Sequence, residues 1–386
     1  MSSTATLRIV HLSSAHYAID PRILHKECKS LAKAGHDVTL VARHEKDQVI
    51  GGIKIRAVAI PRNRWQRWTC TVWWVYREVA RLNADVYHFH DPELIPVGVW
   101  LSLLGKSVIY DAHEDLPNTF SYKHYIPAFA RRALGWLAGR IENLAVRRFA
   151  GVAAATPTIA KKFYAHNANT VVVSNFPLLD ELAGAPSLPW KERPPLVVYV
   201  GSIARERGFR EAVIAMSLIL PELNARLALA GPLTPELREE IVALPGSERT
   251  DLVGLLLDRR EIAALLGRAR VGLVSLHGTP NYVNALPIKL FEYMSAGVPV
   301  VASDFPLWRQ IVEGSGCGLL VDPLDAKSIA RAIEYLLTHP EEAQQMGARG
   351  RIAVENRYNW KTEEQQLLAL YNFPSCRSRR LVGSDA

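Results

Sequence analysis

The sequence is poor in cysteine, and its four cysteines are too scattered to suggest a disulfide framework or a metal site. No two of them form a Cys-x-x-Cys pair, so a reducing compartment fits best. The chain also lacks an apolar run of about 18 residues, the length that a membrane-spanning helix needs. A strand pattern at 7–10 occupies the position of a signal peptide's apolar region. We therefore expect a cytoplasmic protein without a membrane-spanning segment.

Acidic residues are scarce in the first half of the chain. Residues 1–185 contain 23 Lys and Arg against 15 Asp and Glu, whereas the remaining residues contain 23 of each. The net charge of +8 therefore belongs to the first half. A basic half indicates an anionic partner, either a membrane surface, a phosphorylated acceptor or a nucleic acid. No recognisable DNA- or RNA-binding motif supports the last of these, and no nucleic-acid partner is expected.

Short apolar runs alternate with helical patterns along the whole chain, which predicts an α/β fold with parallel sheets. The first series of runs lies at 8–12, 38–42, 86–89, 108–110, 152–155 and 171–173. The second series lies at 196–200, 226–230, 271–276, 298–302 and 318–321. With 386 residues the chain is long enough for two domains, and each series predicts a Rossmann-like one.

Proline marks the expected boundary between the two domains. Prolines and polar residues at 185–195 exclude a helix and a central strand there. We expect an N-terminal domain at 1–185, a linker at 186–195 and a C-terminal domain at 196–360. Residues 361–386 are expected to form a helix that returns to the N-terminal domain, followed by a loose tail.

The segment 281–303 has the most informative pattern in the chain. It predicts a loop, a helix that opens at Pro287, a stop at Gly297 and a buried strand. The unpaired N–H groups at such a helix start can hold a phosphate or a sugar hydroxyl. Lys289 adds a cation in the first turn. Glu292 follows on the same face, where a carboxylate can accept the hydroxyls of a ribose.

The residues 287–303 resemble the donor-site signature of the retaining glycosyltransferase family 4, or glycosyltransferase group 1. Residues 198–208 resemble the first strand and the diphosphate loop of that family's C-terminal domain. Residues 20–38, 90–94 and 110–117 resemble the N-terminal domain of a bacterial polysaccharide-assembly branch. The resemblance covers residues 7–372. It implies the GT-B fold, in which two Rossmann-like domains face a central cleft.

The resemblance also implies a nucleotide-sugar donor and assigns roles to individual residues. The catalytic residues would be His113, Arg207 and Lys289. The donor-binding residues would be Gly201, Ser202, Arg205, Asn284, Leu286, Pro287, Ile288 and Glu292. The acceptor-side residues would be His16, Asp20, Arg22, His90, Asp91 and Glu93. Asp20 is equally explained as the N-cap of the helix that starts at Pro21, and a structural turn equally explains 90–93.

Two positions depart from the family pattern. Asn284 stands where the family has the first glutamate of a Glu-x7-Glu motif, and its amide can bind a hexose hydroxyl but supplies no charge. Gly201-Ser202 replaces the usual Gly-Arg, which leaves Arg207, with Arg205 nearby, to meet the diphosphate.

No metal and no cofactor are expected, because the chain has no strict Asp-x-Asp motif. The resemblance implies that the departing diphosphate accepts the proton of the attacking hydroxyl, so that the sugar is transferred with retention and without a side-chain nucleophile. The acceptor would be a glycan or a polyprenyl-diphosphate-linked sugar.

Two basic stretches also carry large apolar residues. Residues 62–77 include Trp65, Trp68, Trp73 and Trp74, and residues 131–148 include Trp136 and Leu137. Helices of this kind can lie on an anionic membrane, and a half-buried core helix explains the pattern equally well.

Three other functions fit part of the sequence. A nucleotide-sugar epimerase or an inverting transferase would share the fold, and product stereochemistry distinguishes them. A basic-surface binding protein without catalysis would explain the charge but not the 287–303 signature. An inactive sensor would explain Asn284.

Overall fold

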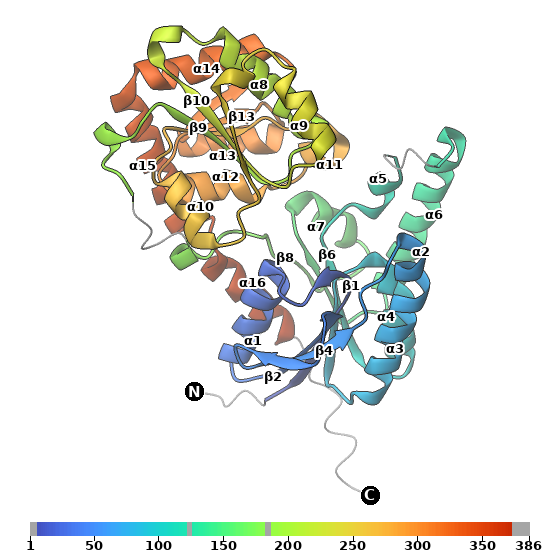
Figure 1. The fold of residues 1–386 in the computed structure, drawn as a ribbon. Coiled ribbons are helices and arrows are strands. Elements are labelled where there is room, and N and C mark those ends of the chain that lie inside the picture. The colour runs from blue at the N-terminus through green and yellow to red at the C-terminus, as the bar shows by residue number, and fades with distance from the viewer. Residues whose placement is uncertain (1–5, 122–125, 182–186, 373–386) are drawn as a thin grey trace, which may run out of the picture. The chain divides into compact units, whose positions relative to one another are not determined.

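The computed structural model describes residues 6–121, 126–181 and 187–372 (Figure 1). The chain divides into two compact units: Met1–Asn175 with Lys361–Ala386 (unit 1), and Phe176–Trp360 (unit 2). The boundary therefore falls ahead of the expected linker, whose described residues belong to unit 2. The reason is that Arg193 donates hydrogen bonds to the carbonyls of Leu188 and Ala269 and so ties this stretch down. Residue 186 and the expected tail, 373–386, lie outside the described residues.

Unit 1 is built on an eight-stranded sheet in the order β3-β4-β2-β1-β5-β6-β7-β8. Neighbouring strands pair in parallel except β3 with β4. The strands are β1 (Arg8–Tyr17), β2 (Asp37–Arg43), β3 (Gln48–Ile50), β4 (Ile53–Val58), β5 (Val86–Phe89), β6 (Ser107–Ala112), β7 (Gly151–Ala154) and β8 (Thr170–Val172).

The helices of unit 1 cover both faces of its sheet, with α3 and α4 on one side and α1 and α16 on the other (Figure 1). In chain order they are η1 (Pro21–Cys28), α1 (Lys29–Lys33), α2 (Arg64–Gln66), η2 (Arg67–Thr71), α3 (Val72–Arg81), η3 (Pro92–Leu94), α4 (Ile95–Leu103), α5 (Leu116–Ser121), α6 (Ala128–Val146), α7 (Pro157–Phe163) and α16 (Trp360–Tyr371). As the sequence predicts, the side chain of Asp20 caps η1 by accepting from the N–H groups of Arg22 and Ile23.

Unit 2 has a six-stranded parallel sheet in the order β11-β10-β9-β12-β13-β14. Its strands are β9 (Leu196–Val200), β10 (Arg226–Ala230), β11 (Thr250–Gly254), β12 (Val271–Val274), β13 (Val300–Ser303) and β14 (Gly318–Val321). Its helices are η4 (Leu179–Glu181), η5 (Trp190–Glu192), η6 (Arg205–Arg207), α8 (Phe209–Leu218), η7 (Pro221–Leu223), α9 (Pro235–Val242), η8 (Ser247–Arg249), α10 (Arg259–Leu266), α11 (Pro280–Val283), α12 (Ile288–Ser295), α13 (Pro306–Ser315), α14 (Ala326–Thr338) and α15 (Pro340–Asn356).

Side-chain alternation along β9 explains the two cores of unit 2. Val198 and Val200 join a core with α12 and α13, whereas Val197 and Tyr199 join a second core with α8 and α14. The strand order reverses between β9 and β12, and ligands of open parallel sheets bind outside the carboxyl ends of strands at such a point.

The expected α/β class with two parallel-sheet domains is confirmed. Among the described residues, no helix combines the length and the apolar character needed to cross a bilayer.

Candidate functional site

The loop after β9 carries the first group of predicted donor-binding residues. Gly201 and Gly208 both have positive φ, +116° and +75°. A Cβ on Gly208 would lie 1.8 Å from the carbonyl oxygen of Ser275, so only glycine allows the loop to approach the carboxyl end of β12 this closely. The hydroxyl of Tyr199 donates to the carbonyl oxygens of Ser202 and Arg207, each at 3.1 Å, and fixes both ends of the loop.

The two arginines of this loop have different surroundings. Arg205 is exposed and makes a two-pronged ion pair with Glu240 on α9, with contacts of 3.0 to 3.2 Å. The guanidinium of Arg207 lies 5.5 Å from the ring centre of Tyr282 on α11. Arg207 therefore faces the segment that leads into α12, while Arg205 is already paired.

The segment before α12 differs from the prediction by one short helix. Residues Pro280–Val283 form α11, and Asn284 is its exposed C-cap. Pro287 is the N-cap of α12, so Ile288 is the first helical residue, one position later than predicted. Half-buried Leu286 packs against the core of unit 2.

Lys289 is the most unusual side chain of the predicted donor site. It is buried, its Nζ lies 3.6 Å from the ring centre of Tyr199, and none of the described residues forms a hydrogen bond with this Nζ. Burial, and then the positive charge of Arg207, lower the pKa of Lys289 to about 7. A buried ammonium that lacks an anionic partner is costly, so the site favours a ligand that supplies negative charge.

Glu292 lies one turn further along α12 and is almost fully buried. Its Oε1 accepts a hydrogen bond of 2.6 Å from a terminal nitrogen of Arg259, the first residue of α10. The same nitrogen donates to Glu181 at 3.1 Å. The predicted donor-site carboxylate is therefore held by an arginine that the sequence analysis did not single out.

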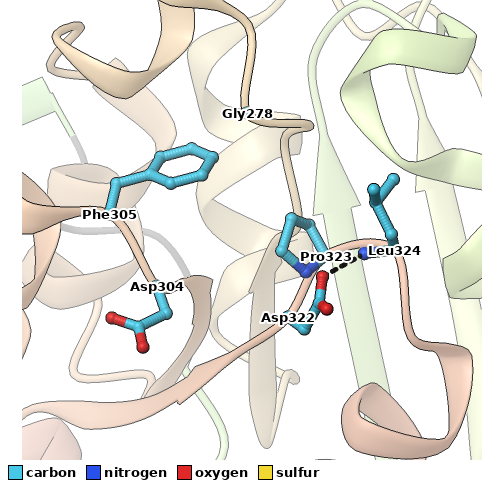
Figure 2. Close-up of a pocket in the computed structure, with 6 residues that line it drawn as sticks. All are labelled: Gly278, Asp304, Phe305, Asp322, Pro323 and Leu324. Carbon is cyan, nitrogen blue, oxygen red and sulfur yellow. Dashed lines mark hydrogen bonds between the residues drawn. The ribbon is translucent and has the colours of Figure 1, made fainter.

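A pocket of about 370 Å³ opens at the carboxyl ends of β13 and β14, and Figure 2 shows the side chains around it. Asp322 accepts from the backbone N–H of Leu324 there, at 2.9 Å. The pocket is lined by Gly278, Asp304, Phe305, Asp322, Pro323 and Leu324, none of which is a predicted site residue.

In unit 1 the alternation of strand residues gathers ionisable side chains on one face of the sheet. Phe89 and Tyr110 point into the apolar core, so His88, His90 and Asp111 point to the opposite face. His11 on β1 pairs in register with His88. All four of these ionisable side chains are fully buried.

Hydrogen bonds connect this cluster in one direction. Because the carboxylate of Asp111 only accepts, Nδ1 of His90 donates to it at 3.1 Å, and Nε2 of His90 accepts from Nδ1 of His11 at 2.9 Å. Nε2 of His11 then faces the hydroxyl of Tyr371 on α16 at 3.3 Å. Burial lowers the pKa of both histidines, which keeps them neutral.

Arg22 supplies the positive charge of the cluster. It contacts Asp111 at 2.9 Å and Glu27 at 2.8 Å. Although burial opposes it, Arg22, followed by His113, holds the pKa of Asp111 well below its usual value. Burial and the charge of Asp111 raise the pKa of Glu27 well above the usual value. Arg22 therefore acts as a structural counter-ion as well as a predicted acceptor-side residue.

A metal ion could be held by one ligand atom each from Glu27, His88, His90 and Asp111, which lie within 4.8 Å of one another. Arg22 already stands between the two carboxylates of this group. The positive charge that a cation would supply is thus present in the chain itself.

The remaining unit 1 candidates surround this cluster. His113 donates from Nε2 to Asp111 at 3.0 Å and stacks on His16, with ring centres 5.6 Å apart. Nδ1 of His16 pairs with Asp91 at 3.1 Å, and this bond and charge raise the pKa of His16 although burial opposes them. Glu93 pairs with Arg67 at 3.0 Å. His16, Glu93 and His113 are partly exposed, whereas His90 and Asp91 are buried.

Two family matches together cover most of this chain. Residues 22–176 match the glycosyl transferase 4-like domain, and residues 184–353 match the glycosyl transferases of group 1. The chain belongs to the group 1 glycosyltransferases. The first match lies in unit 1 except for its last residue, and the second lies in unit 2. The second match includes the predicted donor site at the start of α12.

The chain is 26% identical over 183 residues to the alpha-maltose-1-phosphate synthase of Mycolicibacterium smegmatis, a match to 46% of the chain and 47% of the relative. The chain thus spans about half the length of the first curated relatives that it matches.

Solved structures show the fold of the chain, which is GT-B. The sucrose-phosphate synthase of Thermosynechococcus elongatus superposes with a TM-score of 0.73 at 22% identity and covers 94% of this chain and 98% of its own. The Anabaena HepE protein in complex with UDP-glucose superposes with a TM-score of 0.70 at 14% identity, with coverage of 94% and 98%.

Proposed function

We propose that the chain transfers a hexose-type sugar from a UDP- or GDP-sugar to a saccharide or lipid-linked acceptor, with retention, in the assembly of cell-surface polysaccharide or another glycan. The observation that carries this proposal is the buried Nζ of Lys289 at the start of α12, which has no hydrogen-bond partner in the part of the chain that the structure describes. The complex of the HepE protein with UDP-glucose supports a nucleotide-sugar donor for a chain of this fold.

Charge development explains how this site would act. Cleavage of the bond between the sugar and the diphosphate places negative charge on the departing oxygen. Lys289, Arg207 and the free N–H groups at the start of α12 would stabilise that charge, a preorganised role worth several kcal/mol of barrier. The diphosphate itself would accept the proton of the acceptor hydroxyl. The role of His113 as a contact of the donor sugar stays a prediction of the family resemblance.

Donor binding is tested first by thermal shift with UDP, GDP and their hexose conjugates, because a ligand of the folded state raises the melting temperature. Failure of every nucleotide to shift the melting temperature would contradict the proposal. For each donor that binds, NMR spectroscopy of the transfer product then gives its anomeric configuration, and an inverted configuration would exclude retention.

Two substitutions test the site itself. Arg207→Ala and Glu292→Ala are expected to leave a folded protein with very low transfer activity, because each removes a proposed contact to the donor. Arg238→Ala, an exposed arginine on α9, is the matched control. Unchanged turnover in both site variants would refute this assignment.

We also propose that transfer needs no metal ion, since Lys289 and Arg207 supply the positive charge that Mg²⁺ provides elsewhere. A chelator is then expected to leave the initial rate unchanged. Complete loss of activity that added Mg²⁺ or Mn²⁺ restores would overturn this part of the proposal.

The helix α6 supports peripheral binding to an anionic membrane through unit 1. Its exposed side chains include Phe129, 86% accessible, and Trp136, 66% accessible. Arg131, Arg132 and Arg140 lie on the same helix. Exposed aromatic and aliphatic side chains interleaved with arginine suit the interface of an anionic bilayer. Trp65 and Trp73 on the preceding helices are exposed as well, whereas the side chain of Trp68 lies outside the described residues.

Vesicle sedimentation tests the membrane proposal. The protein is expected to sediment with vesicles that contain phosphatidylglycerol, and Phe129→Ser with Trp136→Ser is expected to reduce the bound fraction several-fold. Vesicles of phosphatidylcholine alone serve as the control. Equal recovery in the supernatant with both kinds of vesicle would dismiss membrane binding.

A further inference from the structure

Arg259 connects three elements of unit 2 around the predicted donor-site carboxylate. It is the first residue of α10, and one of its terminal nitrogens donates to Glu292 on α12 at 2.6 Å and to Glu181 in η4 at 3.1 Å. The two carboxylates in turn raise the pKa of Arg259 although its partial burial opposes this. Arg259 therefore stays charged and bound to two anions.

The position of Lys289 shows the effect of the ion pair between Arg259 and Glu292. Lys289 precedes Glu292 by three positions on α12, a spacing at which opposite charges on a helix ordinarily pair. Within the described residues the Nζ of Lys289 nevertheless has no hydrogen-bond partner, and Glu292 forms its ion pair with Arg259. Arg259 thus takes the carboxylate and leaves the lysine available to a ligand.

The hydrogen bonds of Glu292 point to the same role. Arg259 contacts Oε1, and Oε2 makes no hydrogen bond with the described residues. Glu181 holds the same nitrogen of Arg259 from the other side, so the contact to Glu292 has a second anchor. One oxygen of Glu292 is fixed by the protein and the other is left for a hydroxyl donor.

We infer that Arg259 is a positioning residue for the donor: it orients Glu292 toward the ribose hydroxyls of the nucleotide and prevents Glu292 from neutralising Lys289. This inference rests on the proposed nucleotide-sugar site. Without Arg259, Glu292 pairs with Lys289, and the contacts to the ribose and to the diphosphate both weaken.

The selectivity for ribose over deoxyribose measures this role directly. Affinities are measured by calorimetry for UDP and GDP, each beside its 2′-deoxy counterpart, with the full-length chain. A buried carboxylate that loses its hydroxyl partner penalises the deoxy ligand, so the wild type is expected to prefer the ribonucleotide on the order of tenfold. Arg259→Ala is expected to reduce that preference to about twofold or less and to weaken both ligands.

Further variants separate positioning from loss of folding. Arg259→Lys keeps one charged contact and is expected to recover part of the selectivity, and Glu181→Gln is expected to give an intermediate value. Arg260→Ala, an exposed neighbour on the same helix, should retain the wild-type ratio. Melting temperatures of all four variants identify any that are misfolded. If Arg259→Ala is misfolded, the test rests on Arg259→Lys and Glu181→Gln.

The outcomes distinguish this inference from the proposed function. Absence of nucleotide binding in the wild type would remove the proposed function itself. If the wild type prefers the ribonucleotide and Glu292→Gln abolishes this preference, the proposed nucleotide site is supported. If Arg259→Ala and Arg259→Lys then keep the wild-type ratio of affinities for ribonucleotide and 2′-deoxynucleotide, the positioning role alone is overturned.

Discussion

Binding of a nucleoside diphosphate is expected to draw a proton onto Lys289. The side chain is buried beside Arg207, and its pKa of about 7 compares with an ordinary value of 10.5. This difference corresponds to a cost of about 5 kcal/mol for keeping the ammonium charged in the empty site. A diphosphate next to the amine removes most of that cost and restores the charged form.

The size of the effect follows from the pKa. At pH 8 about nine-tenths of the Lys289 side chains are neutral in the free protein, so binding takes up about 0.9 proton. At pH 6 only about a tenth are neutral, and Lys289 contributes about 0.1 proton. Proton uptake by Lys289 therefore increases with pH between 6 and 8.

Calorimetry in phosphate and in Tris, two buffers with very different ionisation heats, gives the proton count directly. Lys289→Met is the reference variant, because the terminal phosphate of the nucleotide titrates near pH 6 by itself and contributes equally to both proteins. Equal proton uptake by wild type and Lys289→Met at pH 8 would refute the argument that this lysine is neutral in the empty site.

Three further predictions concern stability. Gly208→Ala should lower the free energy of unfolding by on the order of 3 kcal/mol in urea titrations, because its Cβ would meet the carbonyl of Ser275 in a left-handed backbone; no loss would contradict the close approach. Trp308→Ala should cost about 3 to 5 kcal/mol in the same assay, since the indole is fully buried, and a loss below about 1 kcal/mol would argue against that packing. Burial raises the pKa of Glu363 to about 7, so the folded state binds more protons than the unfolded chain between pH 4.5 and 7, and its stability falls as the pH rises through that window. Glu363→Gln should gain up to about 3 kcal/mol relative to wild type between pH 5 and pH 8 in melts across that range, and a constant difference would count against the assignment.

Periodicity in the sequence predicted most strands of the two sheets but missed β3, β4 and β11. Predicted runs such as 226–230 and 196–200 coincide with β10 and β9, because a buried parallel strand is a continuous apolar run. The N-cap at Asp20 was also predictable, since the N–H groups that donate to it belong to Arg22 and Ile23, two and three positions further along the chain. Local chemistry is visible in a sequence wherever the interacting groups are close along the chain.

Pairings between distant residues were not predictable. Arg205 resembles a free phosphate ligand in the sequence, yet its partner Glu240 lies 35 positions away. Arg259 was overlooked because its partner Glu292 lies 33 positions away on another helix. A charged side chain reveals its type in a sequence but not which opposite charge folding brings to it.

The buried histidine cluster of unit 1 was predictable only in part. The spacing of His88 in β5 and His90, the residue just after this strand, indicates one shared face. The partners of that face come from β1 and from α16, whose Tyr371 is 283 positions beyond His88. The order of strands in the sheet, which places β1 beside β5, could not be predicted from the sequence.

The return of α16 to unit 1 has a consequence for synthesis on the ribosome. Leu367 and Leu370 of this helix are fully buried, and a Cβ on Gly151 would meet Leu370 at 2.5 Å. Unit 2 has its own two ends joined, since Trp360 donates its N–H to the carbonyl of Pro177 at 2.9 Å. Unit 1 can therefore complete its packing only with a helix that is synthesised after the whole of unit 2, so its folding cannot finish before the last part of the chain is available.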